Sequence, residues 1–143
     1  MSRTVQIVID CSDPAAVAEF WAEALGYVLQ PPPEGFASWE DALKAWGVPP
    51  DQWNSRSAVV DPDGAGPRIF LQQVPEAKAG KNRLHLDVRV SDPSSEPQAR
   101  DDALMAEVER LEGLGARRLE WRFEESKHFM VMQDVEGNEF CLT

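Results

Sequence analysis

His85 has the widest chemical scope of any residue in the sequence, and it lies in the segment RLHLDVRV, residues 83–90. It is one of only two histidines in the chain. An imidazole can ligate a divalent metal ion or transfer a proton near neutral pH. If residues 83–90 form a strand, Asp87 and Arg89 share the face of His85, because side chains alternate along a strand. Three roles therefore stand open for His85: a hydrogen-bonded structural residue, a ligand-binding or acid–base group, or a metal ligand.

A second distinctive segment holds three tryptophans, Trp39, Trp46 and Trp53, within fifteen residues. Large aromatic side chains can wall a binding cleft, where an apolar or aromatic ligand stacks on them. They can also anchor a long loop to the core, and loops serve both purposes. The binding interpretation assigns Trp46 and Trp53 to the ligand-binding cleft.

The elements that must position these residues occur twice in the chain. In the first half a β-branched strand is followed by Ser12, Asp13 and Pro14, which are typical of a helix start. An apolar helical pattern then ends at Gly26, and three further strands are expected at residues 27–30, 56–61 and 68–74. The second half repeats this order with strands at residues 83–90, 116–122, 128–134 and 139–143 and a helix at 103–115.

Several residues recur at matching places in the two halves. Ser-Asp-Pro occurs at residues 12–14 and again at 91–93, an offset of 79 that also aligns Gln6 with His85. Further matches in the same order are Asp61 with Asp134, Gly64 with Gly137, and Gly26 with Gly115. The pattern predicts an α+β protein built from two tandem βαβββ modules. We place module one at residues 3–74, a linker at 75–82 and module two at 83–143, together forming a single domain over 1–143.

Paired βαβββ modules with these helix caps, and with the turns DPDG and VEGN before the last strand of each half, resemble the vicinal oxygen chelate superfamily. That superfamily includes glyoxalase I, bleomycin-resistance proteins, fosfomycin-resistance enzymes and extradiol dioxygenases. The segments KNRLHLDVRV and MQDVEGNEFCL are most similar to its glyoxalase-like branch. The resemblance covers nearly the whole chain. It implies a curved mixed sheet around a cleft between the modules, and a homodimer.

The resemblance also implies where a metal would be held, on the first and fourth strands of each module. Those positions are Gln6, Gln72, His85 and Cys141 here, where metal-using members carry His and Glu. A neutral amide is a weak ligand, and one imidazole with one thiol seldom makes a tight site. We therefore expect no cofactor, and His85 with Glu139 or Asp87 as the ligands if a divalent metal binds.

Composition excludes several classes of function. The formal net charge of −11 argues against nucleic-acid or anionic-membrane partners, because nothing offsets phosphate repulsion. No run approaches the roughly 20 apolar residues of a membrane span, and the first residues do not form a signal peptide. Cys11 and Cys141 form no metal-type pair, so we expect two reduced thiols in a cytoplasmic protein.

The function expected from this sequence is metal-independent binding of a small organic molecule, as in the bleomycin-resistance-like members it resembles. The alternative is a glyoxalase-like lyase or isomerase that uses a divalent metal or His85 as its acid–base group. The residues assigned to the cleft are Gln6, Trp46, Trp53, Gln72, His85, Asp87, Glu139 and Cys141.

Overall fold

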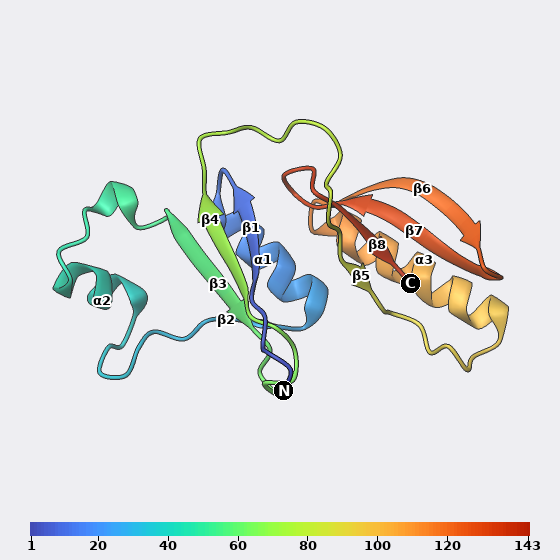
Figure 1. Cartoon of the computed structure of the whole chain (residues 1–143), viewed down its shortest axis with the longest axis horizontal. Helices are drawn as coiled ribbons and strands as arrows, with labels where there is room; N and C mark the ends of the chain where they lie inside the picture. Colours follow the sequence, from blue (N-terminus) through green and yellow to red (C-terminus); the bar gives the residue numbers. More distant parts are fainter. The chain divides into compact units, whose positions relative to one another are not determined.

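The computed structural model describes residues 1–143 and contains two compact units, Met1–Ala77 and Lys78–Thr143. We call them the N-terminal and C-terminal units (Figure 1). The N-terminal unit contains β1 (Ile7–Cys11), α1 (Pro14–Leu25), β2 (Val28–Leu29), α2 (Trp39–Ala45), a 3₁₀ turn η1 (Pro50–Gln52), β3 (Arg56–Val60) and β4 (Ile69–Gln73). The C-terminal unit contains β5 (Asp87–Val88), α3 (Pro97–Gly113), β6 (Arg117–Glu124), β7 (Lys127–Gln133) and β8 (Glu139–Leu142).

Each unit has its own open, mixed sheet of four strands, in the orders β1-β4-β3-β2 and β5-β8-β7-β6. The first and last strands of a unit pair in parallel, and the remaining pairs are antiparallel. The expected α+β fold of two βαβββ modules is thus confirmed. None of the helices combines the length and the apolar character that a membrane span requires.

Helix α1 begins where the sequence predicts. The Asp13 carboxylate accepts a hydrogen bond from the Ala16 N–H at 3.2 Å, and Pro14 occupies the first turn, where no N–H is needed. Val17, Phe20 and Trp21 recur at helical spacing and are buried against the sheet. The helix ends at Gly26, whose φ of 67° is a left-handed conformation that glycine adopts without steric cost.

Helix α3 does not begin at the second Ser-Asp-Pro, so the expected cap at residues 91–93 is wrong. The Asp92 carboxylate instead accepts hydrogen bonds from the N–H and the hydroxyl of Ser94, closing a local turn. The helix starts at Pro97, with Glu96 as an N-cap that makes no side-chain hydrogen bond. Its core residues Leu104, Val108 and Leu111 are at most 1% exposed. The helix packs against β6 and β7 of the C-terminal sheet (Figure 1).

Strand β5 is shorter than the predicted strand at residues 83–90, but its pairing continues beyond the strand. The Cys141 N–H donates to the Leu86 carbonyl at 2.9 Å, and the Val90 N–H donates to the Thr143 carbonyl at 2.8 Å. His85 therefore lies two residues before the regular strand, next to this ladder.

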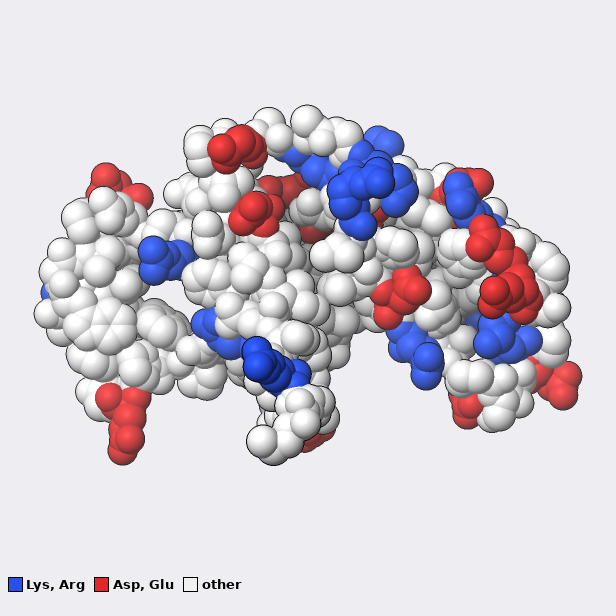
Figure 2. All heavy atoms as spheres, viewed as in Figure 1, with Lys and Arg blue, Asp and Glu red and all other residues white.

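Strand β6 is the free edge of the C-terminal sheet, and all eight of its residues are exposed. Its turn to β7 consists of Glu125 and Ser126, with φ of 50° and 65°. Two-residue turns with both φ values positive normally contain Asn or Gly, so this hairpin tip is strained. On the face shown in Figure 2, acidic and basic side chains are interspersed.

Candidate functional site

A pocket of about 560 Å³ lies within the C-terminal unit, at the end of its sheet. Residues from β5, β8, the β6–β7 hairpin and the first turn of α3 line it. Both histidines of the chain, His85 and His128, are among them. The aromatic rings of Phe123 and Phe129 also line the pocket.

His85, Asp87 and Cys141 converge at this pocket. Asp87 and Cys141 are Cα partners on the parallel strands β5 and β8, so their side chains share a face. His85 Nε2 lies 3.2 Å from Asp87 Oδ1, and one donor atom from each of the three residues lies within 4.8 Å of the others. His85 and Asp87 are exposed, whereas Cys141 is buried. An imidazole, a carboxylate and a thiol therefore face one space.

The thiol of Cys141 holds its proton more strongly than an ordinary cysteine. Burial raises the pKa of Cys141, and the negative charge of Asp87 raises it further, against the opposite influence of Lys81 and Arg122. A hydrogen bond with Asp87 acts in the same direction as burial. Because the thiolate is the reactive form, Cys141 is a poor nucleophile at neutral pH.

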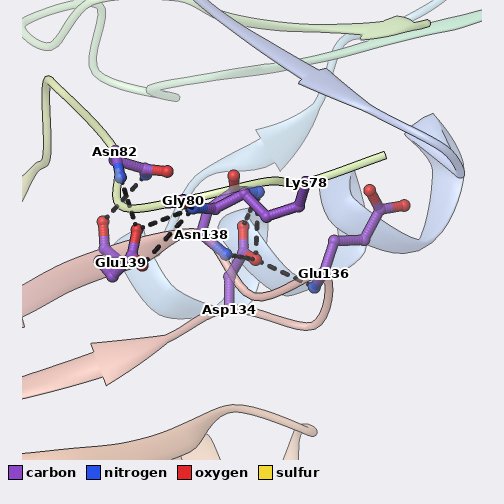
Figure 3. Close-up of polar contacts among 7 residues, drawn as sticks. All are labelled: Lys78, Gly80, Asn82, Asp134, Glu136, Asn138 and Glu139. Carbon is purple, nitrogen blue, oxygen red and sulfur yellow. Dashed lines mark hydrogen bonds and ion pairs between the residues drawn. The ribbon is translucent and has the colours of Figure 1, made fainter. Parts of the chain in front are cut away.

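Glu139, the other carboxylate considered for His85, is used elsewhere. Its carboxylate accepts a hydrogen bond from the Asn82 N–H at 2.9 Å and forms an ion pair with Lys78 at 3.1 Å (Figure 3). The Asn82 hydrogen bond is the main cause that lowers the pKa of Glu139. Glu139 therefore fastens residues 78–82 to the start of β8, and Asp87 is the carboxylate beside His85.

The turn before β8 is organised by Asp134, which is only 4% exposed. Its carboxylate accepts hydrogen bonds from the N–H groups of Glu136 and Asn138 at 3.0 and 2.9 Å (Figure 3). Asp61 does the same in the N-terminal unit, accepting from the Asp63 and Gly66 N–H groups. The two aspartates matched in sequence thus have the same structural role.

The predicted site residues of the N-terminal unit make contacts of their own. The Gln6 side-chain carbonyl accepts a hydrogen bond from the Arg68 guanidinium at 2.5 Å. The Cα partner of Gln72 is Asp10, whereas that of Cys141 is Asp87. The offset of 79 between the two halves matches Asp87 with Val8, and not with Asp10. Gln72 and Cys141 therefore do not occupy equivalent positions on the last strands of the two units.

Trp46 and Trp53 pack within the segment that contains α2. The Trp46 ring meets Phe36 and Trp39 edge-on, with centroids 5.8 and 6.3 Å away, and remains 55% exposed. The Trp53 indole N–H donates to the Val48 carbonyl at 2.8 Å. These contacts hold the long loop together.

Sequence reasoning missed the second histidine of the pocket. His128 lies at the start of β7, and its Nδ1 lies 2.7 Å from Asp101 Oδ2 on α3. Asp101 precedes it by 27 residues in another element, so no local spacing could indicate the pair. The only available signal was the scarcity of histidine.

Comparison with known proteins agrees with this fold. The model of the glyoxalase-like domain family matches residues 6–143. A glyoxalase/bleomycin resistance protein/dioxygenase family enzyme from Burkholderia phytofirmans has 13% identity and a TM-score of 0.63, over 96% of this chain and 94% of that one. A fosfomycin resistance protein FosX from Listeria monocytogenes, solved as a mutant with Mn(II) and 1S,2S-dihydroxypropylphosphonic acid, has 12% identity and a TM-score of 0.60, over 99% and 89%. A search of curated proteins finds no significant match.

The two βαβββ units and these likenesses define a protein of the glyoxalase/bleomycin resistance/dioxygenase class, the vicinal oxygen chelate superfamily. Within that class, the chain belongs to the glyoxalase-like domain family.

Proposed function

We propose that this protein binds a small organic molecule in the pocket of the C-terminal unit, without needing a metal ion. The observation that carries the proposal is the convergence of His85, Asp87 and Cys141 at one pocket. Its volume of about 560 Å³ is in the range of small-molecule sites, which combine apolar walls with a few converging polar groups. Phe123 and Phe129 supply apolar surface here.

The donor chemistry supports binding without a metal. The Cys141 thiol keeps its proton because its pKa is raised, and Asp87 is already engaged with both His85 and the thiol. A ligand can hydrogen-bond to these groups as they stand. Metal binding would require the thiol to ionise or to remain outside the coordination sphere.

A thermal-shift screen of aromatic and charged small molecules tests the proposal. We expect stabilising compounds whose effect is weakened in His85→Ala. Leu84→Ala is the matched control, since Leu84 is adjacent in sequence, 89% exposed and not part of the pocket lining. If no compound stabilises the protein, or if His85→Ala responds as the wild type does, the proposal is wrong.

The second candidate is a glyoxalase-like lyase or isomerase that uses a divalent metal or the imidazole of His85. The donor group His85, Asp87 and Cys141 favours it, since three protein ligands with an open fourth position are typical of catalytic zinc sites. Imidazole and thiolate suit Zn²⁺ better than Mn²⁺, which prefers oxygen ligands. Such an ion would polarise an oxygen atom of the substrate.

Metal content separates the two candidates. The untagged protein is purified after supply of Zn²⁺ or Mn²⁺ and its bound metal is measured. About one equivalent of zinc in the wild type, lost in His85→Ala and reduced in Cys141→Ser, would establish the metal site and overturn metal-free binding. If no stoichiometric metal is found, the second candidate can only be an enzyme that uses the imidazole of His85 as its acid–base group.

We also propose that the protein is a cytoplasmic homodimer. Neither Cys11 nor Cys141 forms a disulfide, and both are buried, as expected of thiols in a reducing compartment. Val8, Val28 and Leu29 are each more than 40% exposed on the N-terminal unit and offer apolar surface to a second copy. Light scattering at micromolar concentration tests the assembly, and a monomer mass would contradict it.

A further inference from the structure

The Asp101–His128 pair is a second polar centre of the C-terminal pocket, apart from His85, Asp87 and Cys141. It joins the first turns of α3 to the start of β7, with 2.7 Å between Asp101 Oδ2 and His128 Nδ1. Both side chains are about one third exposed, so they remain accessible from the pocket that they line. Rings of Trp121 and Phe123 lie 4.9 and 4.8 Å from the imidazole, which fixes its orientation.

The contact with Asp101 decides which nitrogen of His128 is basic. An ionised carboxylate only accepts hydrogen bonds, so Nδ1 of the neutral imidazole carries the hydrogen. Nε2 then has the free lone pair, and no side chain of the chain hydrogen-bonds to it. A histidine oriented by a carboxylate in this way is arranged to accept a proton, and the carboxylate stabilises the imidazolium that forms.

The charges around His128 indicate that its ligand arrives neutral. Four carboxylates line the pocket, namely Asp87, Asp101, Glu124 and Glu125, against the three cations Arg89, Arg100 and Lys127. With neutral histidines the lining therefore has a formal charge of −1, which disfavours an anion in solution. Asp87 faces His85, Asp101 faces His128, and Glu124 lies 3.9 Å from Arg122.

The three pocket cations form no ion pair within the chain. All three line the same pocket as His128. They can therefore stabilise a negative oxygen that forms inside the pocket, where charges interact more strongly than in water. Phe123 and Phe129 provide aromatic surface on which a flat ring can stack.

We propose that the pocket takes a neutral aromatic hydroxyl compound and that His128, positioned by Asp101, accepts its proton. The O–H bond of the ligand breaks, its electron pair stays on oxygen, and the proton moves to Nε2 of His128. The products are a bound phenolate and an imidazolium, the first near Arg100 and Lys127 and the second against Asp101. This inference rests on the proposed small-molecule function and names the class of ligand.

The probe is 4-nitrophenol, whose phenolate form is distinguished from the neutral form by its visible absorption. Titration of the whole protein into the probe, at a pH below the pKa of the free phenol, should give the phenolate spectrum. His128→Gln should abolish this spectral change. Asp101→Asn should reduce the bound ionised-to-neutral ratio several-fold, because the imidazolium loses its carboxylate partner.

Two controls separate proton transfer from binding. Asp102→Asn removes the next carboxylate of α3, which contacts Gln98 and does not line the pocket, and should leave the spectrum unchanged. The probe 4-nitroanisole has no acidic proton, so it reports binding alone. Nitrogen NMR of the wild type should show the Nδ1–H tautomer of His128, a measurement that needs no variant.

The outcomes distinguish this inference from the proposed function. If 4-nitrophenol binds but stays neutral, or if its ionisation survives in His128→Gln, His128 is not the proton acceptor. Binding of 4-nitroanisole or other compounds in that case would leave the small-molecule function standing. If no aromatic compound binds, this inference fails, and if no compound of either kind binds, the small-molecule function fails with it.

Discussion

Asp87 and Cys141 are Cα partners on parallel strands, which places a carboxylate beside a thiol that is only 7% exposed. The parallel pairing of β5 with β8 creates this contact, because residues far apart in the chain meet on one face of the sheet. The carboxylate also faces His85, so Asp87 is the central member of the three. Its charge raises the pKa of Cys141.

Asp87→Asn should make Cys141 more acidic. Burial and the charge of Asp87 both raise the pKa of Cys141, so removing the charge should lower that pKa while burial still keeps it above the ordinary value. The rate of alkylation by iodoacetamide, followed against pH in a Cys11→Ser background, gives the midpoint. The midpoint should fall relative to the Cys11→Ser parent. An unchanged midpoint would mean that Asp87 does not act on the thiol.

Asp13→Ala should destabilise the protein by about 1 kcal/mol, since the N-cap of α1 is lost. Hydrogen bonds from Asn54 and from the Ala16 N–H lower the pKa of Asp13. A lowered pKa gives stability that is present above the unfolded-state pKa and lost as pH falls through the folded-state pKa. The difference in urea midpoint between wild type and variant should therefore be largest at neutral pH and shrink in acid.

Glu19→Gln is the control for this measurement, because Glu19 is exposed on the same helix and makes no cap. It should leave the urea midpoint within the error at both pH values. A difference for Asp13→Ala that stayed constant with pH would exclude the ionised carboxylate as its source.

Leu111→Ala should cost about 2–5 kcal/mol of unfolding free energy, because Leu111 is fully buried between α3 and the C-terminal sheet. Leu119→Ala removes the same atoms from a side chain that is 41% exposed on β6, and should cost much less. Thermal unfolding compares the two variants. Equal losses would show that α3 is not packed on the sheet as described.

Glu139→Ala should release residues 78–82 from the start of β8. The carboxylate accepts the Asn82 N–H at 2.9 Å, so that amide should exchange with solvent faster in the variant. Lys78→Met removes the ion pair but keeps this hydrogen bond, and should change the exchange of Asn82 far less. Hydrogen exchange monitored by NMR reads both. Equal acceleration in the two variants would assign the anchoring to Lys78.

The fold was predictable because local signals agree with the global arrangement. Asp13, Pro14 and Gly26 define α1 in the sequence and in the structure. The turns matched in sequence at Asp61 and Asp134 are also turns in the structure, and in each the aspartate accepts backbone hydrogen bonds. The helix start predicted at Asp92 from the repeat was wrong. Ser94, two residues further on, hydrogen-bonds to the Asp92 carboxylate and forms a local turn in place of a helix cap.

The site was only partly predictable, because its members come together through tertiary contacts. The face shared by His85 and Asp87 follows from strand alternation, and the structure brings Cys141 to them. Sequence spacing could not decide whether Asp87 or Glu139 lies beside His85. The answer depends on the hydrogen bond from the Asn82 N–H, which engages Glu139 elsewhere. Asp101 and His128 meet because α3 packs on β7, and the periodicity within each element does not show which of their residues will be in contact.

The exposed strand β6 carries a further consequence, for the behaviour of the protein at high concentration. An edge strand with unpaired backbone groups is a template on which other chains can aggregate. Here Glu120, Arg122 and Glu124 alternate along that edge, with Arg122 2.8 Å from Glu120 and 3.9 Å from Glu124. A second strand that paired there and packed over this row would have to desolvate these charged side chains. These charges therefore protect the chain from fibril-like self-association, and replacing them with threonine or valine would remove that protection.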